Sequence, residues 1–84
     1  MNGYCITFRS ITFAQRGERM LRQYGVGCSL QRTPRWMEEK GCGYCLKVTN
    51  RQVQDAMRLL RQGKIPYRKV YFFSSDGEAT EVSI

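Results

Sequence analysis

Residues 42–63 read CGYCLKVTNRQVQDAMRLLRQG and place two patterns of different period side by side. Tyr44, Leu46 and Val48 alternate with other residues, which is typical of a β-strand with one buried face. Apolar residues then recur at the spacing of an amphipathic helix: Val53, Ala56, Met57 and Leu60. A strand that leads directly into such a helix indicates a mixed fold in which the two share one core.

An earlier strand and helix follow each other in the same order. Residues 4–8, YCITF, alternate as a strand does, and residues 12–24 carry apolar side chains at helical spacing. Thr12 and Gln15 have the spacing of a capping box, which predicts the start of this helix. Gly25 is suited to end it, because glycine adopts the left-handed conformation at little cost.

Two further extended segments, residues 26–36 and 65–73, complete the pattern. Thr49 and Gln52 repeat the capping-box spacing before the second helix. The order β-α-β-β-α-β with right-handed crossovers predicts an α+β fold. We expect a ferredoxin-like sandwich, in which a four-stranded antiparallel sheet carries both helices on one face and leaves the other face open.

The charge of the chain is distributed unevenly. The 84 residues include 14 Lys and Arg, 7 Asp and Glu and no His, for a net charge of +7. Residues 1–73 hold every basic residue, and we expect them to form a single ferredoxin-like domain. Residues 74–84 form an acidic tail, which the Asp76-Gly77 pair could turn back as a short hairpin arm. The basic domain favours anionic partners, and the lack of histidine excludes His-containing triads and Cys/His zinc sites.

The cellular compartment sets the chemistry of the four cysteines, Cys5, Cys28, Cys42 and Cys45. No apolar run approaches the length of a transmembrane helix, and the first ten residues lack the pattern of a signal peptide. We therefore expect a cytoplasmic protein without a membrane association. Cytoplasmic thiols are normally kept reduced, so we interpret these cysteines as thiols and expect at least one to be chemically active.

The stretch KGCGYC, residues 40–45, is compatible with an RNA-binding strand. RNA-recognition domains carry a motif on the third strand that begins with a base and a glycine, and Lys40, Gly41, Gly43 and Tyr44 fit it. Cys42, however, lies where a base-stacking aromatic residue belongs, and a thiol cannot stack on a base. A small basic RNA-binding module on the open sheet face is therefore an alternative function. A third is a non-catalytic interaction domain, with a homodimer as one form.

A metal site is also compatible with the spacing, because Cys42 and Cys45 form a CxxC pair. A second such pair is missing, so Cys5 and Cys28 would have to complete the site. The first strand neighbours the third in this topology, which could bring Cys5 near Cys45, whereas Cys28 lies at the far end of the central hairpin. We expect neither a metal nor another cofactor.

A reactive thiol is the interpretation that we favour. Cys42 lies between Gly41 and Gly43, where the backbone can turn sharply and no side chain shields the sulfur. Cys45 could act as a resolving thiol. Three basic residues, which the hairpin brings to the same end, favour the nucleophilic thiolate and could bind an anion: Arg32, Arg35 and Lys40.

The TPR of residues 33–35 and the GCG of residues 41–43, within YCITFRSITFA and QVQDAMRLLRQGKIPY, resemble the selenium/sulfur carrier-like family of small prokaryotic proteins. The resemblance covers residues 4 to about 67. It implies a carrier rather than an enzyme, which holds sulfur or selenium as a persulfide or perselenide on Cys42. It also implies a donor or acceptor protein as partner. Family members generally have a small or apolar residue in place of Cys45, so a dithiol role is an added expectation for this chain.

Overall fold

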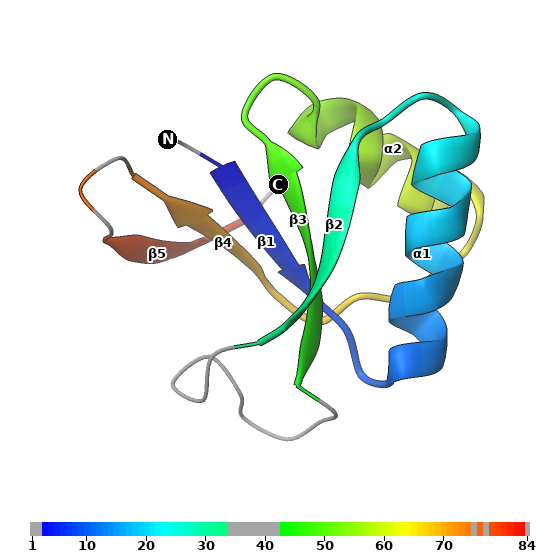
Figure 1. The fold of residues 1–84 in the computed structure, drawn as a ribbon, viewed down its shortest axis with the longest axis horizontal. Helices are drawn as coiled ribbons and strands as arrows, with labels where there is room; N and C mark the ends of the chain where they lie inside the picture. The colour runs from blue at the N-terminus through cyan, green and yellow to red at the C-terminus, as the bar shows by residue number, and fades with distance from the viewer. Residues whose placement is uncertain (1–2, 34–42, 75, 77, 84) are drawn as a thin grey trace.

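The computed structural model describes residues 3–33, 43–74, 76 and 78–83 (Figure 1). Seven elements follow one another: β1 (Gly3–Thr7), α1 (Ile11–Gln23), β2 (Cys28–Arg32), β3 (Tyr44–Thr49), α2 (Val53–Gln62), β4 (Val70–Phe73) and β5 (Ala79–Val82). The strands form one antiparallel sheet in the order β2-β3-β1-β4-β5, and both helices lie on the same face of it. We call the other side the open face.

The α+β class and the β-α-β-β-α-β order of the first six elements are confirmed, but the sheet has five strands, not the four that the sequence predicted. The acidic tail supplies the fifth strand, because β5 pairs antiparallel with β4 from Val70↔Val82 to Phe73↔Ala79. The amide of Ser74 donates to the carbonyl of Glu78 at 2.9 Å where the chain turns. Val82 packs against the main core, which gives the strand an apolar anchor.

Both helices begin differently from the prediction. The side chain of Ser10, not Thr12, caps α1 by accepting a hydrogen bond from the amide of Phe13 at 3.4 Å. Gln52 is the N-cap residue of α2 and makes no capping bond with its side chain. The two capping boxes are therefore wrong, although both helices form where their apolar periodicity predicted them.

The side-chain amide of Gln52 instead connects the start of α2 to the segment after α1. It accepts a hydrogen bond from the amide of Gly27 at 3.1 Å and donates one to the carbonyl of Gly25 at 3.4 Å. Gly25 has a φ of +81°, so the prediction of a left-handed glycine after α1 is confirmed. A long polar side chain thus replaces the short capping residue that the sequence suggested.

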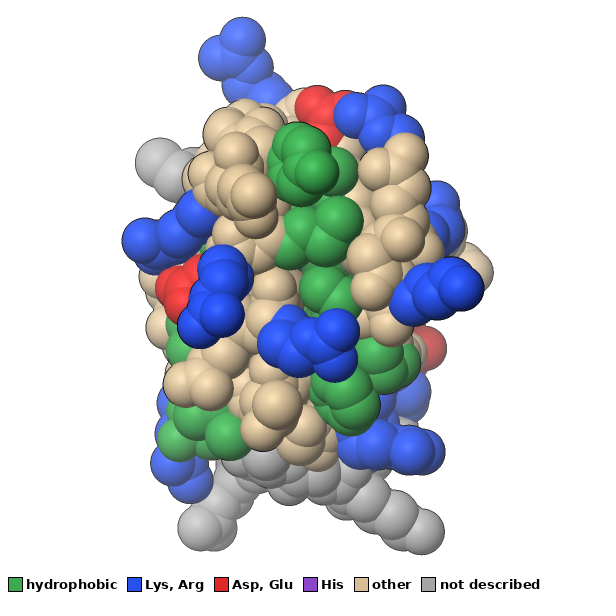
Figure 2. Space-filling model, turned by 90° about the vertical axis from the view of Figure 1, so that its right-hand side faces the viewer, with side chains coloured by type: hydrophobic (Ala, Val, Ile, Leu, Met, Phe, Trp, Pro, Cys, Tyr) green, Lys and Arg blue, Asp and Glu red, His purple; other side chains and the backbone are tan. Residues whose placement is uncertain are grey.

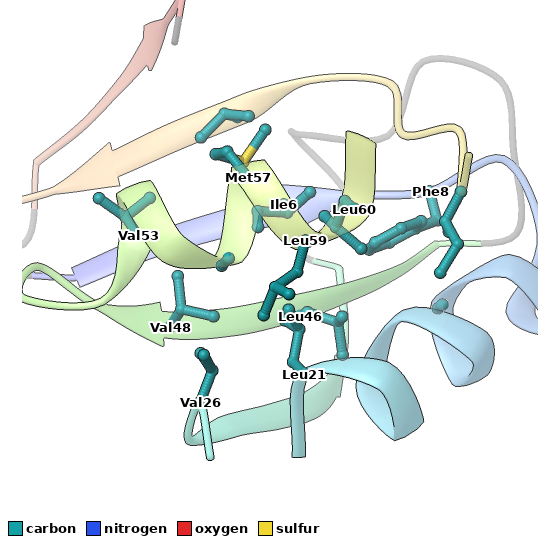
Figure 3. Close-up of a cluster of buried hydrophobic side chains, with 14 residues drawn as sticks. Ile6, Phe8, Leu21, Val26, Leu46, Val48, Val53, Met57, Leu59 and Leu60 are labelled. Atoms are coloured by element: carbon teal, nitrogen blue, oxygen red, sulfur yellow. The ribbon is translucent and has the colours of Figure 1, made fainter. Parts of the chain in front are cut away.

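The main core lies between the helices and the sheet (Figure 3). Ile6 of β1 and Leu46 of β3 are fully buried beneath Leu60 of α2. Gly17 of α1 allows this close approach, because a Cβ atom there would lie only 3.1 Å from Cδ1 of Leu46 and 3.2 Å from Cδ2 of Leu60. The glycine inside the helix is thus explained by packing against the sheet.

Candidate functional site

Four of the residues predicted to form the site lie outside the described part of the chain: Arg35, Lys40, Gly41 and Cys42. The structure describes the other three, Arg32, Gly43 and Cys45. Gly43 directly precedes β3, Cys45 is the second residue of that strand and Arg32 is the last residue of β2. The described part of the site therefore consists of these three residues and the side chains that contact them.

Cys45 lies on the open face of the sheet. Its neighbours Tyr44 and Leu46 pack with the main core, so the alternation of the strand directs the thiol to the opposite side. Cys45 is paired with Thr7 of β1 on one side and with Gln31 of β2 on the other. Its side chain is nevertheless only 1% exposed, so this thiol is buried on the open face.

Cys5 of β1 is the partner of Cys45. It is paired with Lys47 in the β1–β3 ladder, which places it diagonally across from Cys45 on the same face. Cys5 is 3% exposed, and both thiols pack with Tyr71 of β4 in a cluster separate from the main core. We call Cys5 and Cys45 the thiol pair. Its members come from two neighbouring central strands of the sheet.

The two thiols shift each other's pKa in opposite directions. A hydrogen bond from the Cys5 thiol lowers the pKa of Cys45 to about 7, although burial acts in the opposite direction. The same hydrogen bond, together with burial, raises the pKa of Cys5 above its ordinary value of 9.0. The two groups therefore titrate as a unit, with one proton lost near neutral pH and the second retained. Near pH 7 a large share of Cys45 is thiolate, the nucleophilic form of cysteine.

Thr33, directly after β2, is the second group that interacts with Cys45. It is 5% exposed, and its amide donates a hydrogen bond to the carbonyl of Gly43. Its hydroxyl helps to lower the pKa of Cys45, yet it has no hydrogen-bond partner of ordinary geometry within residues 3–33 and 43–83 as described. The neutral thiol is a poor acceptor and the thiolate a good one, which accounts for both observations. Without an acceptor, a buried hydroxyl costs about 1–3 kcal/mol.

Lys47 supplies positive charge next to the thiol pair. It lies on the open face two residues after Cys45, and its charge lowers the pKa of both Cys45 and Cys5. Its ammonium group lies 5.8 Å from the centre of the Phe73 ring on β4, which holds the cation over the sheet. Lys47 also lines a hollow of about 340 Å³ together with Gly3, Ser29 and Thr49. The thiols are buried, but their cation reaches the surface.

Arg32, in contrast, lies on the other side of the sheet from Cys45. It is paired with Tyr44, and its guanidinium carbon lies 5.5 Å from the centre of the Tyr44 ring, next to the main core. The structure therefore does not bring Arg32 and Cys45 together. It also places Tyr44 on the helix-facing side, so this aromatic ring is not presented for base stacking on the open face, where the RNA-binding alternative needs it.

The outer side of the helices is rich in basic side chains. Figure 2 shows this side, where Lys and Arg side chains greatly outnumber Asp and Glu. Arg22 of α1 and Arg58 of α2 form ion pairs with Glu18 and Asp55, at 3.2 Å and 3.0 Å. The helices still carry more Arg than acidic residues. This surface is positively charged and lies away from the open face.

Cys28 of β2 differs from the thiol pair in its surroundings. It packs against the main core, and its thiol lies 3.8 Å from the carbonyl of Glu18, to which it donates. Burial raises the pKa of Cys28, and nearby Arg22 only partly opposes this. Cys28 thus lies away from Cys45, as its expected position at the far end of the central hairpin implies. Within the described residues, no three His, Cys, Asp or Glu side chains gather as metal ligands.

Sequence reasoning singled out Cys45 but not the residues that ionise it. The strand order had already placed Cys5 near Cys45, and that proximity was considered only for a metal site. Thr33 appeared in the TPR motif without a role, and Lys47 was given no role at the site. The alternation of neighbouring strands could have indicated these residues, because it places Cys5, Cys45 and Lys47 on the same face of the sheet, with Thr33 directly after β2.

Comparison with protein families gives a match over residues 3–72 to the model described as "Putative Se/S carrier protein-like". The matched range includes the whole thiol pair, Thr33 and Lys47. Comparisons with curated proteins and with solved structures give no significant match. None of the described helices combines the length and apolar character needed to cross a membrane.

Proposed function

This chain belongs to the Se/S carrier protein-like family, and we propose that it carries a sulfur or selenium atom as a persulfide or perselenide. In this proposal Cys42 accepts the atom and Cys45 is the second thiol, which can take the atom over or resolve the persulfide. The domain then acts as a shuttle, and a partner protein performs the chemistry that generates or consumes the cargo.

The observation that carries the proposal is the burial of Cys45 in one small cluster with a second thiol, Cys5. The pKa of Cys45, lowered to about 7, favours a nucleophile at neutral pH, and Cys45 lies three residues after Cys42 in the chain. A thiolate attacks the outer atom of a persulfide, forms a new sulfur–sulfur bond and expels the first cysteine as thiolate. The terminal atom then lies on Cys45, and no oxidant or reductant is consumed.

The glycines and basic residues near Cys42 have supporting roles in the proposal. Gly43 has a φ of +73°, which non-glycine residues adopt only with strain, and this favours a turn between the two cysteines. Gly41 would provide similar freedom on the other side of Cys42. Arg35 and Lys40 would stabilise the anionic cargo, while the basic surface of the helices would guide an acidic partner protein.

The proposal is tested by loading the reduced protein with glutathione persulfide and measuring the intact mass and the modified peptides. We expect one added sulfur atom on Cys42 or Cys45 in the wild type and none in Cys42→Ser. Cys28→Ser is the matched control, because Cys28 lies on the other face, and it should load normally. Loss of two protons without added sulfur, together with a disulfide that maps to Cys42 and Cys45, would instead indicate a dithiol switch of these two residues. Unchanged loading of Cys42→Ser would contradict the assignment of Cys42 as acceptor.

A further inference from the structure

We propose that Cys5 and Cys45 form a dithiol centre that reduces the carried atom and releases it as hydrosulfide or hydroselenide. The inference rests on the proposed function for the delivery of the atom to Cys45. It adds a reaction, reductive release, and a residue, Cys5, which the sequence analysis considered only as a possible metal ligand. The ligand of the centre is a single sulfur or selenium atom bonded to Cys45.

The register of the sheet brings the two sulfur atoms together. Cys5 faces Lys47 in the β1–β3 ladder and Cys45 faces Thr7, so the cysteines occupy diagonal positions on one face of paired strands. Both side chains are buried in the same small cluster, together with Tyr71 of β4. β1 and β3 are both interior strands of the sheet, which keeps the pair at a fixed separation.

The Thr33 hydroxyl and the Lys47 ammonium group could stabilise an anion next to the thiol pair. The Thr33 hydroxyl is buried and lacks a hydrogen-bond partner of ordinary geometry within the described segments, although it lies beside Cys45. A terminal chalcogen on Cys45 is an anion and would accept a hydrogen bond from it. The ammonium group of Lys47 adds positive charge to the same face. An unpartnered donor and a cation next to a thiol pair are what a bound per-chalcogenide anion needs.

The release step balances without a further reagent. The loaded state contains Cys5 as thiol and Cys45 bonded to a terminal sulfur or selenium anion. The sulfur of Cys5 attacks Sγ of Cys45, a Cys5–Cys45 disulfide forms, and the bond from Cys45 to the terminal atom breaks. The proton of Cys5 passes to the leaving atom, which departs as HS⁻ or HSe⁻. The two cysteines are oxidised and the cargo is reduced, by two electrons. An external dithiol reductant then restores the pair.

Burial suits this reaction. Cys5, Cys45 and Tyr71 are 3%, 1% and 9% exposed, so the reacting atoms are largely withdrawn from water and dissolved oxidants. A chalcogen held here would be protected until it leaves. Cys28 lacks these conditions, because its thiol faces a backbone carbonyl and no second cysteine. It therefore serves as the internal control.

The experiment uses the full chain loaded with glutathione persulfide, then separated from the donor by gel filtration. A sulfide electrode follows release, and mass spectrometry maps disulfides. The wild type should release one sulfide for each Cys5–Cys45 disulfide formed. Cys5→Ala should still take up sulfur through Cys42, but it should release sulfide at least about tenfold more slowly for each sulfur atom loaded, since no resolving thiol remains beside Cys45. Cys5→Ser, which retains a polar group of similar size, should behave like Cys5→Ala, and Cys28→Ala should behave like the wild type.

The outcomes separate this inference from the proposed function. Wild-type protein that takes up no sulfur would overturn both. Wild-type protein that loads normally, with Cys5→Ala or Cys5→Ser releasing sulfide at the wild-type rate, would overturn the dithiol centre alone. A disulfide that maps to Cys42 and Cys45 in the wild type would also overturn it, because Cys5 would then not be the resolving thiol.

Discussion

The two faces of the sheet use the same strands for different purposes. On the helix-covered face, Ile6 and Leu46 are fully buried in a large apolar core. On the open face, the adjacent residues Cys5 and Cys45 are buried in a small cluster with Tyr71. Burial is similar on the two sides, but one cluster is hydrocarbon and the other contains an ionisable pair.

This difference teaches how a small domain can stabilise a buried thiolate. An unpaired buried charge is costly, and here a thiol, a hydroxyl and an ammonium group offset that cost. These groups are positioned by β1, the end of β2 and β3, whose register is fixed by the apolar core on the other face. The core therefore determines the geometry of the thiol pair without touching it.

The largest expected effect is the loss of stability when the core on the helix-covered face is disrupted. Leu46→Ala leaves a cavity in the main core and should lower the free energy of unfolding by about 2–5 kcal/mol. Tyr24→Ala is the control, because this side chain is 63% exposed, and its effect should stay within about 0.5 kcal/mol. Urea denaturation measures both. Equal effects of the two substitutions would contradict the placement of the core.

A second effect should appear in the pH dependence of stability. The pKa of Cys45 is lowered from 9.0 to about 7 in the folded state. Between these values the unfolded chain binds one more proton than the native pair, so the free energy of unfolding should rise with pH. Above about 9 the unfolded chain loses both thiol protons while the native Cys5 keeps its own, so the free energy of unfolding should fall again. The rise in the wild type relative to Cys45→Ser should be on the order of 1–2 kcal/mol. Parallel curves for the two proteins would contradict the ionisation.

Removing the hydroxyl of Thr33 should have a smaller effect whose sign depends on pH. Near pH 6 Thr33→Val removes a buried hydroxyl without a good acceptor, so stability should be unchanged or slightly higher. Near pH 8 the thiolate loses a donor, and stability should fall by about 1 kcal/mol. Thr80→Val, at an exposed position of β5, is the control and should show no such reversal. Denaturation at the two pH values provides the measurement.

The smallest effect concerns the exposed cation. Lys47→Met should raise the pKa of Cys45 by less than about half a unit, because water and salt screen an exposed charge. The difference from wild type should shrink further in about 1 M salt. Lys64→Met, a charge removal after α2, should leave the pKa unchanged. If Lys47→Met shifts the pKa of Cys45 by an amount that does not depend on salt, Lys47 acts through packing instead.

The order and faces of the elements were predictable because they depend on local periodicity. Tyr44, Leu46 and Val48 were assigned to the buried face, and the structure confirms it. The local Asp76-Gly77 signal suggested that the tail could turn back as a short hairpin arm, but it did not predict that the tail pairs with β4 as a fifth strand of the sheet or that Val82 packs against the main core. The predicted cap of α2 failed because Gln52 bonds to residues about 25 positions away in the chain, whereas in α1 the nearby Ser10 is the cap in place of Thr12.

The candidate site was only partly predictable. A CxxC spacing drew attention to Cys45 but said nothing of its burial or of Cys5, since the two meet only through the register of β1 and β3. Proximity in sequence also suggested that Arg32 could serve the site, whereas strand parity places it on the face opposite to Cys45. Charge near a thiol in sequence is thus a weaker guide than the face on which each residue lies.

The ionisation of Cys45 by Cys5 can be measured directly by NMR titration of the cysteine ¹³Cβ shifts, which report the thiolate even when it is buried. In the Cys42→Ser background, Cys45 should titrate with a midpoint near 7. Cys5→Ala should move this midpoint upward by about one unit or more, while Cys28→Ala leaves it in place. A midpoint of Cys45 at or above 9.0, or one that does not respond to Cys5→Ala, would contradict the thiol pair as the centre of this site.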